Sequence, residues 1–333
     1  MNPKSYLCYR TDTPLELDGR LDKPAWQSAS WTDDFVDIEG DLKPLPRFRT
    51  RVKMLWDDAY LYIGAEMEEP HVWATLAERD SIIFQDNDFE VFLDPDGDNH
   101  QYYELEINAL NTVWDLLLIQ PYRDGGPAVH GWNIVGLQTA VHVEGTLNDP
   151  TDQDQGWSVE MALPWKALAE CAHCSCPPLD GDQWRINFSR VQWETEIRDG
   201  KYRKVEGKRE DNWVWSPQGM IDMHRPEQWG IVQFSTAPAG SAVFSPDPAL
   251  PARDLLHRIY YTQREYRRQQ GHWTSDLEAL GCSAPLEPPL LGAPRIELTT
   301  TGFLATVVLA LPDGTTQSWH IRDDSRIWPT PTT

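Results

Sequence analysis

The segment DFEVFLDPDGDNHQYYELEIN, residues 88–108, decides the fold of this chain because its apolar and polar residues alternate with a period of two. Two alternating runs flank a turn rich in Asp, Gly and Asn, and this pattern predicts a β-hairpin. In the first run Phe89, Val91 and Leu93 share one face, whereas Glu90 and Phe92 share the other. The first face is predicted to pack into a core.

The second run divides in the same way and carries a polar face made of Glu104, Glu106 and Asn108. Carboxylate and amide oxygens accept hydrogen bonds from hydroxyl groups, so this face is a candidate surface for a polar ligand. A polar face is also what the solvated side of an antiparallel sheet ordinarily carries. The alternation alone leaves both interpretations open.

Further short alternating segments, separated by Gly, Pro, Asp and Asn, continue this pattern from residue 15 to about residue 235. They are RTRVKMLW and YLYIGAEM, which form a second hairpin, and then TVWDLLLI, TAVHVEG, WSVEMALP, WRINFSRVQW and WGIVQFS. Many strands at short spacing predict a mostly β protein, an antiparallel β-sandwich of the jelly-roll or immunoglobulin-like kind. The segment LPWKALAEC is predicted to form one short helix, which begins at Pro164.

A Pro- and Ser-rich passage then interrupts the strands, and a different pattern follows it. RDLLHRIYYTQREYRRQQG is predicted to be a helix with Gly271 at its C-cap, and TSDLEALG a second short helix. Three strands are predicted next, in RIELTTTG, FLATVVLALP and TQSWHIRD. We therefore expect a β-sandwich over residues 1–236, a linker over 237–251 and a small α+β accessory domain over 252–333.

The net charge limits the partners that this chain can have. With 52 acidic against 29 basic residues the formal charge is -23, which repels nucleic-acid phosphates and anionic membranes and suits neutral ligands or calcium. The N-terminus MNPKSYLCYR shows no export signal and no apolar run spans a membrane, so we expect a cytoplasmic chain, or an extracellular one if a signal was removed. Five cysteines, an odd number, do not indicate a disulfide framework.

Five motifs in order give the first 236 residues a resemblance to carbohydrate-binding module family 9, which is DOMON-like. They are LELDGRLDKPAW, VKMLWDDAYLYIGAEM, the extended hairpin DNDFEVFLDPDGDNHQYYELEIN, GWSVEMALPW and VWSPQGMIDMHRPEQWG. The resemblance implies a β-sandwich with structural calcium that binds oligosaccharide or polysaccharide through stacked aromatic rings and hydrogen bonds. It also implies a role alongside enzymes of polysaccharide breakdown.

The resemblance places a sugar-binding glutamate at Glu90. The two tryptophans that clamp a sugar in the family are replaced here, one by Phe84 and the other by Met223 or His224. From the residues themselves we add the hydrogen-bonding candidates Asn108 and Arg190 and the ring platforms Trp193 and Trp215, with Trp114 as a further platform. Sixteen tryptophans exceed ordinary packing needs, although Trp56, Trp157, Trp184 and Trp229 share faces with apolar residues and are predicted to lie in the core.

Two clusters could bind metal. Asp94, Asp96 and Asp98 alternate as at the start of a calcium-binding loop, although Asp, Gly and Asn also simply make turns. The run CAHCSC, residues 171–176, resembles half of a zinc site, but the sequence shows no second ligand pair, which favours a loop with incidental thiols.

Three functions compete at this point. The first is non-catalytic sugar binding, and it is favoured. The second is O-glycosyl hydrolysis with two of Glu90, Glu106 and Glu160 as the acid and base or nucleophile, which needs carboxyl groups roughly 5 to 9 Å apart. The third is a protein-interaction scaffold that uses the C-terminal domain.

Overall fold

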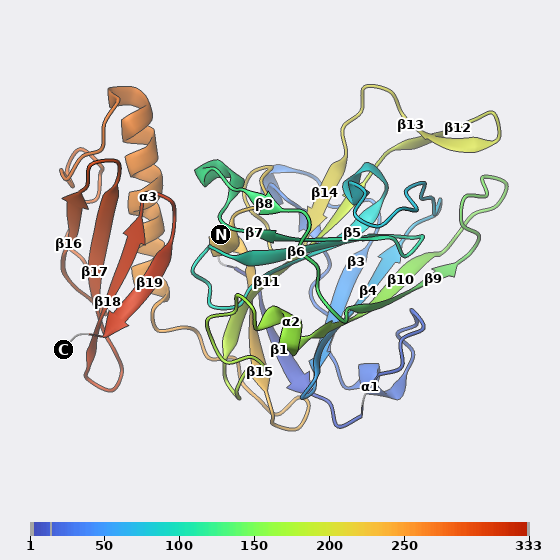
Figure 1. Ribbon diagram of the computed structural model, residues 1–333, viewed down its shortest axis with the longest axis horizontal. Helices are drawn as coiled ribbons and strands as arrows, with labels where there is room; N and C mark the ends of the chain where they lie inside the picture. The colour runs from blue at the N-terminus through green and yellow to red at the C-terminus, as the bar shows by residue number, and fades with distance from the viewer. Residues whose placement is uncertain (1–2, 14, 332–333) are drawn as a thin grey trace. The chain divides into compact units, whose positions relative to one another are not determined.

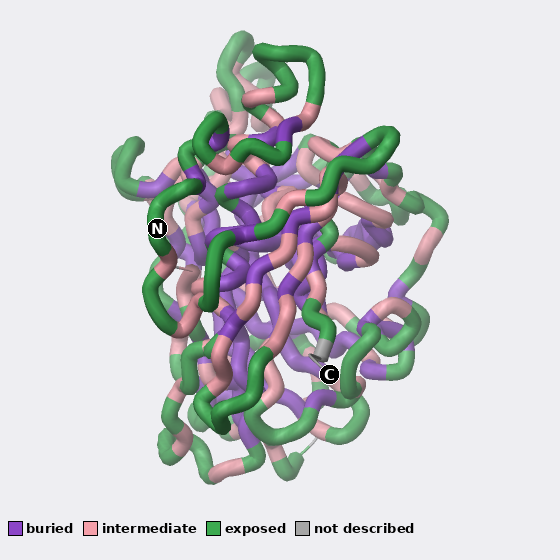
Figure 2. Tube along the Cα trace, turned by 90° about the vertical axis from the view of Figure 1, so that its left-hand side faces the viewer, coloured by how far each residue is buried: buried purple, intermediate pink, exposed green. Residues whose placement is uncertain are grey.

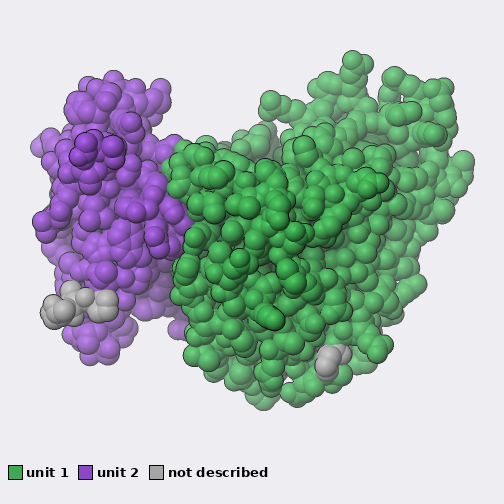
Figure 3. Space-filling view, in the orientation of Figure 1, with its two compact units in different colours: residues 1–96, 101–244 green, residues 97–100, 245–333 purple. Residues whose placement is uncertain are grey.

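A computed structural model describes residues 3–13 and 15–331 of the chain (Figure 1). Contacts between residues divide it into two compact units (Figure 3). The first comprises residues 1–96 and 101–244, and the second comprises residues 97–100 and 245–333. Each unit has its own hydrophobic core, so each is described by itself.

The first unit consists of strands joined by short helical turns. Its larger sheet contains β1 (Ser5–Arg10), β2 (Val36–Asp37), β3 (Thr50–Trp56), β4 (Tyr60–Glu68), β5 (Asp88–Asp94), β6 (Tyr102–Asn108), β7 (Val113–Leu118), β8 (Ala128–Val129), β9 (Gln138–Glu144), β10 (Gly156–Pro164), β11 (Gln183–Gln192), β14 (Asp211–Val214) and β15 (Gly230–Ser235). A separate hairpin contains β12 (Thr195–Arg198) and β13 (Lys201–Lys204). The helical elements are α1 (Pro24–Gln27), η1 (Gly40–Leu42), η2 (Ile83–Gln85), η3 (Tyr122–Asp124), α2 (Trp165–Leu168) and η4 (Pro226–Gln228).

The larger sheet is continuous and curled, in the order β8-β7-β6-β5-β11-β15-β1-β3-β4-β10-β9, with β14 added on β11 and β2 on β14 (Figure 1). The sequence predicts a wholly antiparallel sandwich, and on this point the structure differs. Strand β1 pairs in parallel with both β15 and β3, so it joins what would otherwise be two sheets into one mixed sheet. The prediction missed β1 because it began the strand series at residue 15.

The two halves of the curled sheet enclose a shared core. One cluster of buried side chains takes Phe89 and Phe188 from β5 and β11, and Met54 and Met161 from β3 and β10 at the far end of the strand order. Figure 2 shows this buried interior beneath an exposed outer layer. Each large apolar side chain buried in this way contributes about 1.5–3 kcal/mol relative to an exposed one.

The alternation in residues 88–108 is confirmed. Strands β5 and β6 pair antiparallel, with Phe89 opposite Ile107 and Val91 opposite Leu105, and these four side chains are fully buried in the core. The tryptophans predicted to be core residues are also buried, namely Trp56, Trp157, Trp184 and Trp229. The period-two pattern therefore located both faces of the hairpin correctly.

The second unit packs one long helix, α3 (Leu250–Gln270), against a four-stranded antiparallel sheet. Its strands are β16 (Leu290–Leu298), β17 (Phe303–Ala310), β18 (Thr316–Arg322) and β19 (Ile327–Pro331). Gly271 ends the helix in a left-handed conformation, at φ 80°, as the sequence predicts. The predicted helix in TSDLEALG is a turn, and one strand more than predicted is present, because residues 327–331 pair with β18.

Among the described helices, none is both long and apolar enough to cross a lipid bilayer.

Candidate functional site

The polar face of the β5–β6 hairpin is covered rather than open. Glu90 lies directly opposite Glu106 in the strand register, and Asp88 lies opposite Asn108. Only 6% of Glu90 and 2% of Glu106 is exposed, and Asp88 and Asn108 are fully buried. Segments far apart in the sequence cover this face, so it forms the floor of a pocket and not a flat platform.

The pocket has a volume of about 330 Å³, which is at the small end of the range for small-molecule sites. Three carboxyl groups lie at its floor, those of Glu90, Glu104 and Glu106. Aromatic and apolar side chains line it with them: Ile38, Phe84, Phe92, Trp114, Tyr122, Val191, Ile221, Met223 and His224. The remaining lining residues are polar: Asn212, Glu210 and Asp222.

Hydrogen bonds hold the wall that contains Met223 and His224. Trp229 Nε1 donates to the carbonyl of Met223 at 2.8 Å, and Arg123 donates to the carbonyl of His224 at 2.7 Å. The His224 ring contacts the Tyr102 hydroxyl through Nδ1 at 3.0 Å. Burial, with a smaller effect of Arg123, lowers the pKa of His224 to about 3, so its imidazole is neutral over the physiological range.

Tyr122 forms the most accessible aromatic part of the pocket. It belongs to η3, and 49% of the residue is exposed. Its ring meets that of His224 edge-on, with 4.5 Å between the ring centroids. On the opposite wall, Phe84 is fixed through its backbone, because its N–H donates to Glu106 Oε2 at 2.9 Å and its carbonyl accepts from Trp193 Nε1 at 2.9 Å.

The carboxyl groups at the floor are strongly perturbed. Burial raises the pKa of Glu90 to about 7. Burial together with the charge of Glu90 raises the pKa of Asp88, Glu104 and Glu106 well above their usual range. Near neutral pH Glu90 is therefore about half protonated, and the other three groups retain protons unless a cation balances their charge.

The perturbed pKa of Glu90 predicts a pH dependence of stability in buffer that contains a chelator. Folding raises this pKa from 4.5 to about 7, so the folded chain keeps a proton that the unfolded chain has already released. The stabilisation is complete below the unfolded pKa and is lost as pH rises through about 7, amounting to about 3 kcal/mol. Urea unfolding from pH 4.5 to 8 measures it, as the difference between the native chain and Glu90→Gln. A difference that does not change over this range would contradict the prediction.

The structure brings five of the predicted sugar-binding residues together and places four elsewhere. Lining one pocket are Phe84, Glu90, Trp114, Met223 and His224. The other four residues do not line it: Asn108, Arg190, Trp193 and Trp215.

Hydrogen bonds and burial account for these four residues. Asn108 shares the face of Glu90 but donates to Leu76 O and Asp86 Oδ2. Trp215 is 1% exposed and packs in the main core, so neither face of its ring is open. Trp193 Nε1 donates to the carbonyl of Phe84. Arg190 lies on the face of β11 opposite that of Ser189, and Ser189 pairs with Glu90.

Sequence reasoning missed Tyr122, Ile221 and Asp222, and it included Glu104 only as a member of the polar face. The alternation of faces along a strand indicates that Glu104 belongs to the pocket, because it lies two residues from Glu106 and therefore shares its face. Tyr122 lies in the turn PYRDGG after a strand, where an aromatic residue among turn formers was a usable signal.

Two buried acidic groups could hold a metal ion. The carboxylate oxygens of Asp94, Asp96 and Asp98 lie within 4.8 Å of one another, and so do those of Asp88, Glu90 and Glu106. Oxygen donors at this spacing suit a hard cation such as calcium. In the first group, however, Asp98 already accepts from His100 N at 2.7 Å and from Arg326 Nε at 2.9 Å, and the guanidinium adds positive charge beside that group.

The thiols of the CAHCSC run are poor metal ligands in their present setting. Burial raises the pKa of Cys176 to about 12, which keeps this thiol protonated at neutral pH, whereas Cys174 is exposed. Cys176 Sγ contacts the carbonyl of Trp165 at 3.3 Å. The packing of Cys176 beside α2 accounts for the position of this residue.

The floor and walls of the pocket lie within a segment that matches a known family. Residues 17–235 match the sequence profile of the family described as carbohydrate family 9 binding domain-like. The chain belongs to this family. The family 9 segment contains the whole pocket, from Ile38 to His224, and ends before residues 245–333 of the second unit. A search of curated proteins found no match to the chain.

The solved structures that match this chain include members of family 9. A family 9 carbohydrate-binding module from Caldicellulosiruptor kristjanssonii in complex with cellotriose is 15% identical, with a TM-score of 0.47, and the match covers 73% of this chain and 100% of that one. The same organism's module with glucose is 15% identical, with a TM-score of 0.46 and coverage of 72% and 100%. A protein from Bacteroides uniformis described as carbohydrate-binding is 16% identical, with a TM-score of 0.50 and coverage of 70% and 100%.

Proposed function

We propose that the family 9 segment is a non-catalytic carbohydrate-binding domain that holds an oligosaccharide, or part of a polysaccharide, in the pocket above Glu90. The observation that carries the proposal is the convergence of carboxyl groups and aromatic rings on one cavity. Carboxylates accept hydrogen bonds from the hydroxyl groups of sugars, and aromatic rings pack against the C–H faces of sugar rings. Polysaccharide breakdown is the process that such a domain would serve.

Each part of the pocket has a place in this proposal. Glu90 and Glu104 offer acceptors for sugar hydroxyls, and the neutral His224 adds no charge that would favour an anion. Tyr122 supplies an accessible ring, and Phe84 stands where the family has one of its clamping rings. A structural calcium at Asp94, Asp96 and Asp98 belongs to the same proposal and would stabilise the β5–β6 turn.

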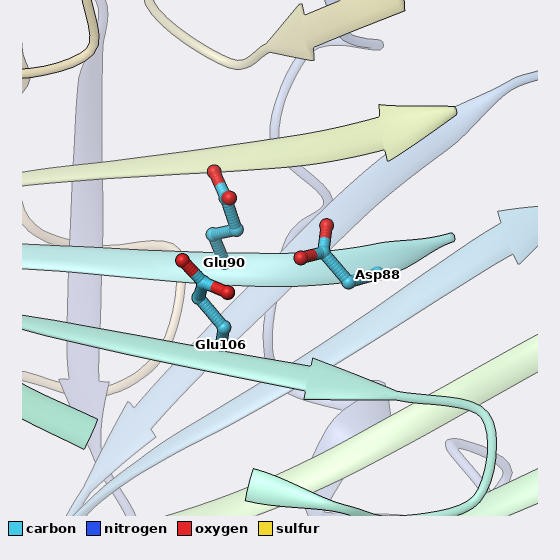
Figure 4. A group of neighbouring side chains, drawn as sticks. All are labelled: Asp88, Glu90 and Glu106. Atoms are coloured by element: carbon cyan, nitrogen blue, oxygen red, sulfur yellow. The ribbon is translucent and has the colours of Figure 1, made fainter. Parts of the chain in front are cut away.

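Hydrolysis is less well supported by the geometry than binding. The carboxylate oxygens of Glu90 and Glu106 lie within 4.8 Å of each other, but they come from directly paired positions on neighbouring strands (Figure 4). Both therefore approach a ligand from the same side, whereas a hydrolase places its two carboxyl groups on either side of the scissile bond. Glu160, the third candidate, does not line the pocket and is fully buried.

Titration calorimetry with a panel of soluble oligosaccharides, including cellotriose and glucose, tests the proposal. We expect Tyr122→Ala to weaken binding at least tenfold, which corresponds to a loss of about 1.4 kcal/mol. Tyr202→Ala is the matched control, because Tyr202 lies on the β12–β13 hairpin and does not line the pocket. Equal affinity of native chain and Tyr122→Ala, or release of reducing ends from bound sugar, would contradict the proposal.

A further inference from the structure

One buried carboxylate oxygen of Asp88 has no hydrogen-bond partner among the described residues. Asp88 is fully buried, and its Oδ1 accepts from the backbone N–H of Val191 at 3.1 Å. Among the described residues none donates a hydrogen bond to Asp88 Oδ2. An unsatisfied carboxylate oxygen in the interior is costly, so its retention needs an explanation.

Asp88 Oδ2 belongs to a compact group of carboxylates. Asp88 and Glu90 are two positions apart on one face of β5, and Glu106 stands opposite Glu90 on β6 (Figure 4). Their ligand oxygens lie within 4.8 Å of one another. A calcium ion at about 2.3–2.6 Å from each oxygen allows them to be up to about 5 Å apart, so the spacing fits such an ion.

The charges around the group are mostly negative. Among the described residues, the charged groups that act most strongly on Asp88 and Glu106 are carboxylates, and Lys204 is a cation whose charge interacts with Asp88. Glu104 adds a fourth carboxyl group on the same face of β6. A bound cation would offset this concentration of negative charge.

The group is also accessible from the pocket. Glu90 and Glu106 line the cavity, whereas Asp88 lies outside its lining. A cation held by the three would therefore have protein oxygens on one side and open positions on the other. Calcium takes six to eight oxygen ligands, so water or sugar hydroxyls would fill the positions that face the cavity.

We propose that Asp88, Glu90 and Glu106 form a binding site for a divalent cation of the calcium class, and that the ion makes sugar binding in the pocket calcium-dependent. The second half of the statement rests on the proposed function, and the first half does not. This site is distinct from the group at Asp94, Asp96 and Asp98, with which it shares no residue.

Calorimetry with calcium chloride on the full, chelator-treated chain at pH 7.5 tests the site. We expect binding to the native chain and at least a tenfold loss of affinity in Asp88→Asn. Asp96→Asn is the matched control, because it alters only the other acidic group. Binding that survives Asp88→Asn and disappears in Asp96→Asn would overturn the proposal, as would no calcium binding at all.

Folding of the variant is checked by circular dichroism and thermal unfolding without metal. Asp88→Asn removes a buried carboxyl group among others, so the metal-free variant is expected to be at least as stable as the native chain. A variant that binds no calcium but unfolds cooperatively supports the site. If Asp88→Asn fails to fold, Glu106→Gln in the same assay decides, with retained affinity overturning the proposal.

Sugar titrations with calcium and with chelator test the second half. We expect at least a tenfold loss of sugar affinity in chelator, and the same loss in Asp88→Asn with calcium present. Equal sugar affinity in both buffers would overturn calcium dependence and leave the sugar-binding proposal intact. Calcium binding without binding of any sugar would leave the cation site intact and contradict the proposed function.

Discussion

Replacing Glu160 with alanine is expected to lower the free energy of unfolding by about 3–5 kcal/mol. Glu160 is fully buried on β10, and its two oxygens accept four hydrogen bonds. Oε2 accepts from the N–H groups of Asp18 and Gly19 at 2.8 and 2.9 Å and from Lys23 Nζ at 2.6 Å. Oε1 accepts from Trp26 Nε1 at 2.8 Å. Alanine would leave all four donors without this acceptor.

Glu160 holds the motif LELDGRLDKPAW in position on the sheet. One carboxylate fixes both ends of the segment from Asp18 to Trp26 against the sheet, so its role is structural and not catalytic. Urea unfolding measures the effect, with Glu144→Ala as the control, since Glu144 is an exposed glutamate on the neighbouring β9. Glu160→Gln should give a smaller loss, because it keeps the shape but loses the charge. A change below about 1 kcal/mol for Glu160→Ala would contradict this account.

Local patterns in the sequence were sufficient for the two faces of the β5–β6 hairpin. The alternation in residues 88–108 placed Phe89, Val91 and Leu93 in the core because burial on one face of a sheet selects every second residue. The same rule places Arg190 on the face of β11 opposite that of Ser189 and Glu90. Arg190 lies two residues from Phe188 on β11, so the two side chains share a face, and Phe188 is a core residue. Applied to β11, the rule predicts that Arg190 lies on the core face.

Long-range features were not predictable from such patterns. The cover over Glu90 comes from η2, η3 and the segment around His224, which are far apart in the sequence and carry no shared period. The parallel pairing of β1 with β15 joins residues more than 200 positions apart, and no short motif records it. For this reason the sequence suggested an open polar platform, whereas the chain forms a pocket with a buried acidic floor.

Replacing Arg190 with methionine is the second change with a large expected effect, again about 3–5 kcal/mol of unfolding free energy. Arg190 is 1% exposed, and it donates to Glu69 Oε2 at 3.1 Å and to Thr50 Oγ1 at 3.0 Å. It also donates to Gln192 Oε1 at 2.7 Å, and its guanidinium lies 5.2 Å from the ring centre of Trp213. Removing it leaves Glu69, which is 2% exposed, as a buried charge without its cation.

The double variant Arg190→Met, Glu69→Gln separates the effect of the unpaired Glu69 charge from the effect of the lost Arg190 packing. Because the glutamine is neutral, we expect the double variant to be more stable than Arg190→Met alone. In a double-mutant cycle, the coupling energy between the two positions should be about 1–3 kcal/mol. Sugar affinity of the folded double variant should stay within twofold of the native value, since the Arg190 side chain leaves β11 on the face opposite Ser189 and Glu90. A tenfold loss of affinity in a folded variant would mean that Arg190 contacts the sugar. Such a result would move the binding site to the other face of β11.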